Sequence, residues 1–268
     1  MFQITILFLY IIAGTAFTLS RLPRFASSSK LLLIIAFSST VAGLSWHGLA
    51  LSSIVLTPAG MSLSLGNTAS FIGLQLALIA LVGSFEQSLR GLSGGLLILA
   101  AVVSPLAGGQ LVANGVESLN WQMQAHILIS LFAYGLLSVG AIVALYALVQ
   151  EKRLHAGMLS SVNQLFAPLE TTERLLFGIA AAGFAVLALA VFSGSIFVDD
   201  LFDQHLVHKT ALSLLALVLF GVLVAGRMFA GWRGKRAVYL YLWGFLILCL
   251  AYFGSRYILE EILGRSWG

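Results

Sequence analysis

Long apolar runs, separated by short loops that hold most of the charge, constrain this chain more than any other feature. Sixty per cent of its 268 residues are hydrophobic and only 9% are charged. A soluble core does not need that balance, whereas helices that face lipid on every side do. Backbone groups in hydrocarbon must be satisfied internally, which excludes open strands. The sequence therefore predicts an all-α, polytopic membrane helix bundle with about eight transmembrane helices.

Each expected helix has roughly the 17–25 residues that cross about 30 Å of hydrocarbon, except the fifth, which is longer. The first lacks a basic segment before it and a small-residue cleavage site after it, so we expect a retained helix rather than a signal peptide. We expect one transmembrane domain over 1–268, with an amphipathic connector on the inner membrane surface at 151–173. The expected spans are 2–20, 31–55, 69–85, 91–107, 122–150, 174–195, 210–230 and 237–259.

Lysine and arginine are concentrated in alternate loops. With the N-terminus outside, eleven of the 14 basic residues fall in inner loops, and only Lys209, Arg256 and Arg265 remain outside. Inner loops of membrane proteins are enriched in these residues, which predicts periplasmic termini in a bacterial inner membrane. The same bias accounts for the net charge of +4, so we expect contact with anionic lipid rather than nucleic acid. The single Cys249 lies inside the last span and predicts no disulfide and no thiol chemistry.

Four of the five histidines belong to the outer half of the expected bundle. A lone histidine at membrane depth commonly hydrogen-bonds a neighbouring helix, but four at one depth favour a shared site. His155, on the inner side, is expected to be a solvated surface residue. The outer four are His47 in the second span, His126 at the start of the fifth, and His205 and His208 just before the seventh.

Imidazole ligates haem iron, copper and zinc. Zinc usually adds cysteine or carboxylate ligands, and the outer Asp199, Asp200 and Asp203 leave a divalent ion open. Haem fits better, because it needs one or two axial histidines in an otherwise apolar, aromatic pocket. Trp46 adjoins His47 and Trp121 precedes His126, although an interfacial tryptophan belt explains both equally well.

Two long stretches, one that begins QAHILISLFAYG at Gln124 and one that begins HLVHKT at His205, resemble the CcsA and HemX haem-handling proteins of the cytochrome c assembly family. The stretch from Gln124 is similar to their histidine-bearing helix, and the stretch from His205 to their C-terminal helix pair. The inner segment around Pro168 is shared with one branch of inner-membrane proteins in that family. The motifs are QAHILISLFAYGLLSVG from Gln124, His208-Lys209-Thr210, Gly231-Trp232-Arg233-Gly234-Lys235-Arg236, and Pro168-Leu169-Glu170 with Glu173 and Phe177.

The resemblance implies a membrane protein that binds or handles haem in support of cytochrome c assembly, with haem and a cytochrome assembly protein or other membrane protein as partners. The family's tryptophan-rich outer loop is missing, so we expect no covalent haem attachment by this chain. His126 matches the first family histidine, and we infer His208 as the second axial ligand to the haem iron. The remaining expected site residues are His47 as an alternative ligand, His205 as a weaker one, Arg256 and Lys209 at the propionates, and Trp121 and Trp46 in the pocket wall.

Other interpretations stay open. The runner-up is a transporter or accessory subunit for a small ion or metabolite, in which the outer histidines form a proton or metal relay. A third is a regulatory protein that binds a membrane partner through 151–173. The basic loop at 231–236 is either a charge anchor or a specific contact, and the anchor is the favoured interpretation.

Overall fold

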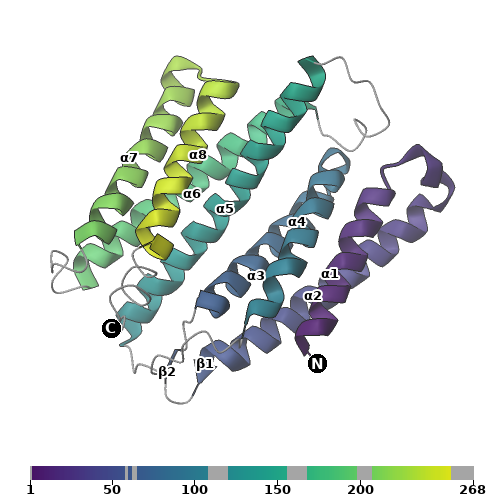
Figure 1. Cartoon of the computed structure of the whole chain (residues 1–268), viewed down its shortest axis with the longest axis horizontal. Coiled ribbons are helices and arrows are strands. Elements are labelled where there is room, and N and C mark those ends of the chain that lie inside the picture. Colours follow the sequence, from purple (N-terminus) through teal and green to yellow (C-terminus); the bar gives the residue numbers. More distant parts are fainter. Residues whose placement is uncertain are drawn as a thin grey trace. The chain divides into compact units, whose positions relative to one another are not determined.

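The computed structural model describes residues 2–57, 60–61, 65–107, 120–155, 168–197 and 207–254. Within these ranges, eight helices are long and apolar enough to cross a membrane, which confirms the predicted all-α polytopic fold (Figure 1). In the same ranges, the one departure from the all-α fold is a short hairpin with two residues in each strand, in which β1 (Leu56–Thr57) pairs antiparallel with β2 (Gly60–Met61). The helices are α1 (Phe2–Leu19), α2 (Ser29–Val55), α3 (Leu65–Ser84), α4 (Arg90–Val103), α5 (Trp121–His155), α6 (Leu169–Phe197), α7 (Val207–Ala230) and α8 (Lys235–Cys249).

Short helical turns extend or connect these spans. Three are 3₁₀ turns, η1 (Pro23–Ser28), η2 (Gln87–Leu89) and η3 (Ser104–Leu106). The fourth, η5 (Leu250–Gly254), is a π-helical turn that continues α8 beyond Cys249. A π turn changes the direction in which the following side chains leave the helix, and such turns are frequent at functional sites.

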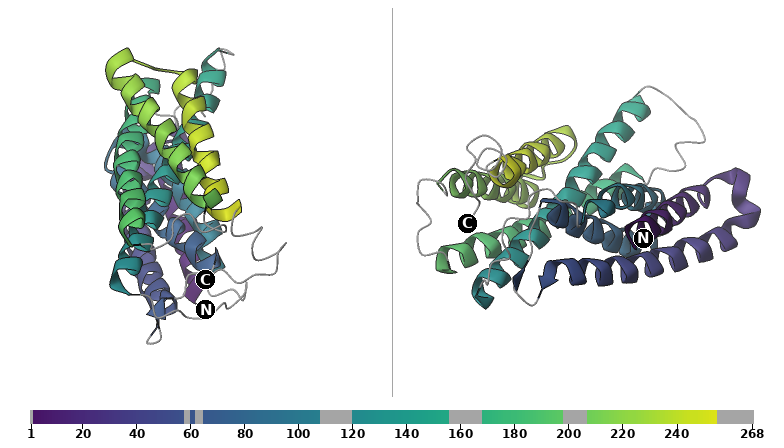
Figure 2. Two further views of the ribbon diagram at one scale, coloured as in Figure 1. Left: turned by 90° about the vertical axis from the view of Figure 1, so that its left-hand side faces the viewer. Right: turned by 60° about the horizontal axis from the view of Figure 1, so that its bottom comes forward.

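The helices form two compact units, each described here by itself. The first holds α1 to α4, and the second holds most of α5 and α6 together with α7 and α8. Within the second unit, α7 and α8 lie side by side in every view (Figure 2). The single transmembrane domain expected from the sequence stays a prediction.

Small residues bring the helices of the first unit together. A Cβ placed on Gly14 of α1 would lie 2.7 Å from the carbonyl oxygen of Gly94 on α4. Thr18 Oγ1 donates to the Gly14 carbonyl at 2.8 Å, so its hydroxyl is satisfied beside this crossing. Close backbone approach through small residues is a common way for membrane helices to associate, because lipid provides no hydrophobic drive between them.

A buried tyrosine connects α5 and α8 in the second unit. Tyr241 is fully buried, and its hydroxyl donates to the Leu137 carbonyl on α5 at 3.0 Å. Gly140 lies against this hydroxyl and has no room for a Cβ. The Phe220 ring of α7 meets the Tyr241 ring edge-on at 5.1 Å between centroids. The tyrosine therefore packs three helices around a satisfied hydroxyl.

The helices that flank the predicted inner connector are longer than the sequence suggested. Residues 151–155 continue α5, and α6 begins at Leu169, directly after Pro168. Thr172 Oγ1 donates to Gln150 Oε1 at 3.3 Å, which ties the two helices together near this end. The rest of the expected amphipathic connector, residues 156–167, lies outside the described residues.

Candidate functional site

His47 is buried on α2 and hydrogen-bonded at both ring nitrogens. Nδ1 lies 3.2 Å from the Tyr10 hydroxyl, and Nε2 lies 2.8 Å from Ser70 Oγ. Ser70 donates its one proton to the Ser104 carbonyl at 3.1 Å, so it accepts from Nε2–H. Nδ1 then accepts from the Tyr10 hydroxyl. This chain of bonds connects α1, α2, α3 and η3, and a ligand role for His47 would require one of them to break.

His126 is half-buried at the start of α5 and has a different environment. Its Nδ1 lies 2.9 Å from Ser193 Oγ on α6. Next to that serine, Gly194 leaves space for the ring, because a Cβ there would come within 2.9 Å of His126 Cε1. Across the ranges that the structure describes, no hydrogen-bond partner reaches Nε2. One nitrogen of this imidazole is therefore available for a ligand.

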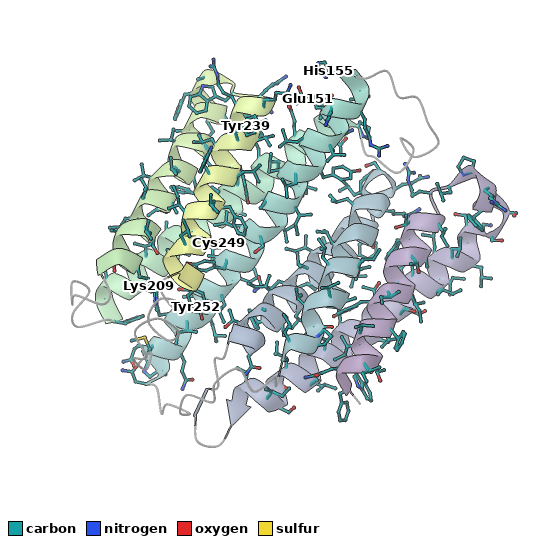
Figure 3. The ribbon with its side chains drawn as sticks, viewed as in Figure 1. Glu151, His155, Lys209, Tyr239, Cys249 and Tyr252 are labelled. Atoms are coloured by element: carbon teal, nitrogen blue, oxygen red, sulfur yellow. The ribbon has the colours of Figure 1, made fainter. Side chains whose placement is uncertain are left out.

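The start of α5, the start of α7 and the end of α8 lie toward the same end of the second unit (Figure 1). Figure 3 shows Lys209 of α7 beside Tyr252 of η5, with the Lys209 ammonium 5.9 Å from the centre of the Tyr252 ring. The Tyr252 ring lies 5.6 Å from that of Tyr134, whose hydroxyl donates to the Leu248 carbonyl at 3.1 Å. The charge of Lys209 is also within electrostatic reach of His126.

Some of the predicted site residues belong to the same unit and others to different units. His126 and Lys209 share the second unit, whereas His47 belongs to the first. Within the described residues, no group of three or more His, Cys, Asp and Glu side chains could hold a metal ion. His208 belongs to the first turn of α7, but its side chain lies outside what the structure describes, as do the whole of His205 and Arg256.

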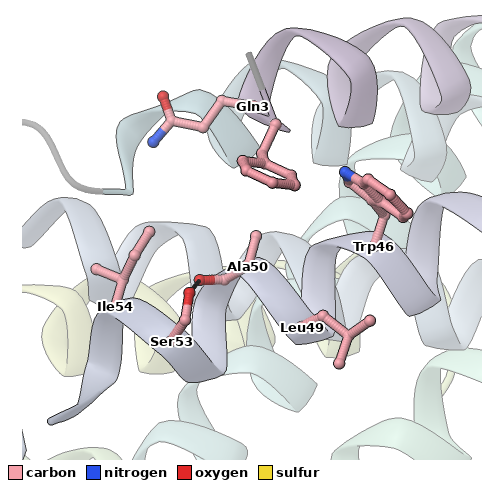
Figure 4. A pocket seen from close by; sticks show the side chains of 7 residues that line it. Gln3, Trp46, Leu49, Ala50, Ser53 and Ile54 are labelled. Carbon is pink, nitrogen blue, oxygen red and sulfur yellow. Dashed lines mark hydrogen bonds between the residues drawn. The ribbon is translucent and has the colours of Figure 1, made fainter.

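Both predicted tryptophans are on the helix surface. Trp46 is 44% exposed and Trp121 is 70% exposed, so neither packs into the interior of its unit. Trp46 borders an apolar groove of about 490 Å³ between α1 and α2, where its ring lies 5.7 Å from that of Phe2 (Figure 4). Because His47 points inward from the next position, Trp46 lies on a different face of α2. The groove is lined by Phe2, Gln3, Trp46, Leu49, Ala50, Ser53 and Ile54.

Two sequence motifs that were identified separately contact each other at the opposite end of the second unit. The Gly234 amide, at φ +63°, donates to Glu173 Oε1 of α6 at 2.9 Å. Arg227 Nη1 donates to the Trp232 carbonyl at 3.1 Å, and its guanidinium lies 4.4 Å from the centre of the Phe177 ring. We call this set of five residues the loop clamp. It gives the loop a specific geometry that a simple charge anchor does not need.

Sequence reasoning missed the polar partners of both membrane histidines. Ser193 belongs to a Ser-Gly-Ser triplet at the end of an apolar span, a signal that could have found it. No such signal marks Tyr10, Ser70 or Tyr252 as site residues, because single polar residues are scattered through all of these spans.

The sequence profile of a family described as "Cytochrome C assembly protein" matches residues 4–263. The chain belongs to the cytochrome c assembly protein family. The curated "Inner membrane protein YpjD" of Escherichia coli (strain K12) is 31% identical over 233 residues, which cover 85% of this chain and 88% of that protein. The proteins of the same name from Escherichia coli O6:H1 and O157:H7 match to the same extent. No solved structure matches. The predicted resemblance to this family and its inner-membrane branch is confirmed.

Proposed function

We propose that this member of the family binds haem through His126 and supports cytochrome c assembly as a haem-handling protein of the bacterial inner membrane. The observation that carries the proposal is the His126 ring, which has Nδ1 hydrogen-bonded and Nε2 without a partner among the described residues. Histidine ligands typically bind a metal through one ring nitrogen, while the N–H of the other nitrogen donates a hydrogen bond. Haem, when bound, would supply the redox-active iron.

The other groups at this end of the second unit fit the remainder of a haem. A propionate needs a cation, and the Lys209 ammonium lies beside the Tyr252 ring. The rings of Tyr134 and Tyr252 offer an aromatic wall, and the Tyr134 hydroxyl is already satisfied by a carbonyl. Within this proposal, Arg256 is a second cation for the propionates and Trp121 a surface residue near the entrance.

The second axial ligand in this proposal is His208, one residue before Lys209, with His205 as the weaker candidate. His47 was the alternative ligand, but both of its nitrogens are hydrogen-bonded. We therefore propose a structural role for His47. Trp46 lines the surface groove and is not part of the proposed haem site.

No tryptophan occurs between Trp121 and Trp232, so the chain has no tryptophan-rich loop on which covalent attachment could take place. We propose that haem is bound without covalent chemistry and is retained or delivered to a membrane partner. The eleven-to-three division of basic residues supports periplasmic termini, which would put His126 on the periplasmic side.

Haem titration of the purified full-length protein in detergent tests this proposal. We expect a saturable shift of the Soret band for the wild type and a much weaker one for His126→Ala. His155→Ala is the matched control, because His155 lies at the other end of α5, is exposed and, among the described residues, bonds only to the Glu151 carbonyl (Figure 3). A wild-type protein with no saturable change would overturn haem binding and return attention to the ion-relay interpretation.

A further inference from the structure

We propose that Ser193 is a positioning residue that holds His126 in the Nδ1–H tautomer, so that the Nε2 lone pair is exposed before any ligand arrives. The haem part of this inference rests on the proposed function. The tautomer part concerns the empty protein and can be tested independently of it.

The hydroxyl of Ser193 decides the tautomer because a serine has only one proton to give. Ser193 Oγ donates to the Ala190 carbonyl, one turn earlier on α6, at 2.9 Å. Toward His126 Nδ1, also at 2.9 Å, the same oxygen can then only accept. The bond to Ser193 therefore requires a proton on Nδ1.

Gly194 fixes the ring from the side. A Cβ at this position would lie 2.9 Å from Cε1, 3.5 Å from Nδ1 and 3.6 Å from Nε2 of His126. The Cε1 corner of the ring, between its two nitrogens, thus occupies the space that the missing side chain leaves. One residue of α6 orients the imidazole by a hydrogen bond, and the next accommodates it by having no side chain.

The first unit provides an internal comparison. Ser70 also accepts from a histidine after donating to a carbonyl, but it faces Nε2 of His47 rather than Nδ1. The two membrane histidines therefore have opposite tautomers. In His47 the remaining nitrogen accepts from Tyr10, whereas no described residue bonds to the remaining nitrogen of His126. A serine partner alone therefore does not distinguish a ligand; which nitrogen it bonds, and whether a described residue bonds the other nitrogen, does.

Nitrogen-15 NMR of histidine-labelled, haem-free protein measures the tautomers directly. We expect His126 to show a protonated Nδ1 and a bare Nε2, and His47 to show the reverse. In Ser193→Ala the His126 signals should shift toward a mixture of tautomers, whereas Ser195→Ala should leave them unchanged. Ser195 is the matched control, because it makes the same backbone bond, to Phe192 at 2.7 Å, and is exposed. A His126 protonated at Nε2 in the wild type would overturn the inference.

The second readout is haem affinity. Loss of a partner that orients a metal ligand typically costs 10–100-fold, so Ser193→Ala should weaken haem binding on the order of ten-fold. Ser193→Thr, which keeps a hydroxyl able to bond back to the helix, should restore most of it. Wild-type affinity in Ser193→Ala would refute the positioning role. A wild type that takes up no haem would refute the proposed function, while the NMR result would still decide the tautomer.

Discussion

Each of the two membrane histidines, His47 and His126, rests against a serine that has already given its proton to a carbonyl. For His47 the hydrogen bonds are complete, and the residue holds four structural elements together. For His126, no described residue bonds to Nε2. A ligand could therefore bind this nitrogen without breaking a bond that the structure describes, which is why His126 rather than His47 is the candidate site.

Replacement of His47 tests this difference. His47→Ala leaves the buried Tyr10 hydroxyl without its acceptor and removes the Nε2–H donor to Ser70, which keeps its bond to the Ser104 carbonyl. The free energy of unfolding should therefore fall by about 1–3 kcal/mol. The Soret band of haem-loaded protein should keep its position. Thermal unfolding in detergent, followed by circular dichroism, and the absorption spectrum measure the two effects. A folded His47→Ala protein without a Soret band would identify His47 as a ligand.

Gly194→Ala tests the space beside the second histidine. The added methyl group would approach the His126 ring carbon to 2.9 Å, so the ring must rotate and haem affinity should fall. Gly178→Ala, also on α6, is the matched control, because nothing lies within 4 Å of its added Cβ. The control should bind haem like the wild type and be as stable or more so, since alanine favours the helix by roughly 0.5–1 kcal/mol. Equal haem titrations for both variants would contradict the packing argument.

At the scale of elements, the loop clamp shows how α6, α7 and α8 are joined at the end of the second unit opposite His126. The sequence favoured a charge anchor for 231–236. The geometry gives the arginines different environments. Arg227 stacks on Phe177 and bonds to the loop, whereas Arg233 and Arg236 are exposed. Charge is enough for an exposed anchor, whereas a stacked guanidinium cannot be replaced by an ammonium.

Conservative substitutions separate the two kinds of arginine. Arg227→Lys loses the stacking on Phe177 and the directed bond, so stability should fall by about 0.5–2 kcal/mol. Arg233→Lys combined with Arg236→Lys should leave both membrane insertion and haem binding unchanged. Thermal unfolding of the purified proteins, with membrane levels as a second measurement, gives the comparison. Loss of cytochrome maturation in the double variant at normal membrane levels would indicate an inner-side partner instead.

The existence of the helices could be predicted because each apolar run is as long as the bilayer is thick. The buried face of each helix could not be predicted, since a helix that is apolar all round has no amphipathic stripe to show which side is buried. Residue type and depth were therefore enough to propose His126 as a candidate ligand, but nothing indicated that Ser193 is its hydrogen-bond partner. The contact between Glu173 and Gly234 was also hidden, because it joins separate helices and depends on how they rotate.

At the scale of the whole molecule, orientation in the membrane decides which compartment the candidate site faces. His47 belongs to the first unit and His126 to the second, and the orientation of the chain decides whether His126 faces the periplasm or the cytoplasm. The charge division of eleven to three predicts inner loops after α1, α3, α5 and α7.

Reporter fusions test that orientation. Fusions after Arg90, Arg153 and Arg236 should report the cytoplasm, and fusions after Thr57 and Asp200 the periplasm. The expectation follows from the cost of moving lysine and arginine across the membrane during insertion. An inverted pattern would move His126 to the cytoplasmic side and would require a cytoplasmic source or acceptor for haem.

The backbone crossing of α1 and α4 also imposes an order on biosynthesis. Gly14 is made early, but the carbonyl it packs against belongs to Gly94, so the partner of this surface is absent until three more helices have entered the membrane. During that interval α1 presents its small-residue face to lipid or to the insertion machinery. A ribosome that stalls before Gly94 therefore leaves an unclosed first unit, and membrane proteases would meet it in that state.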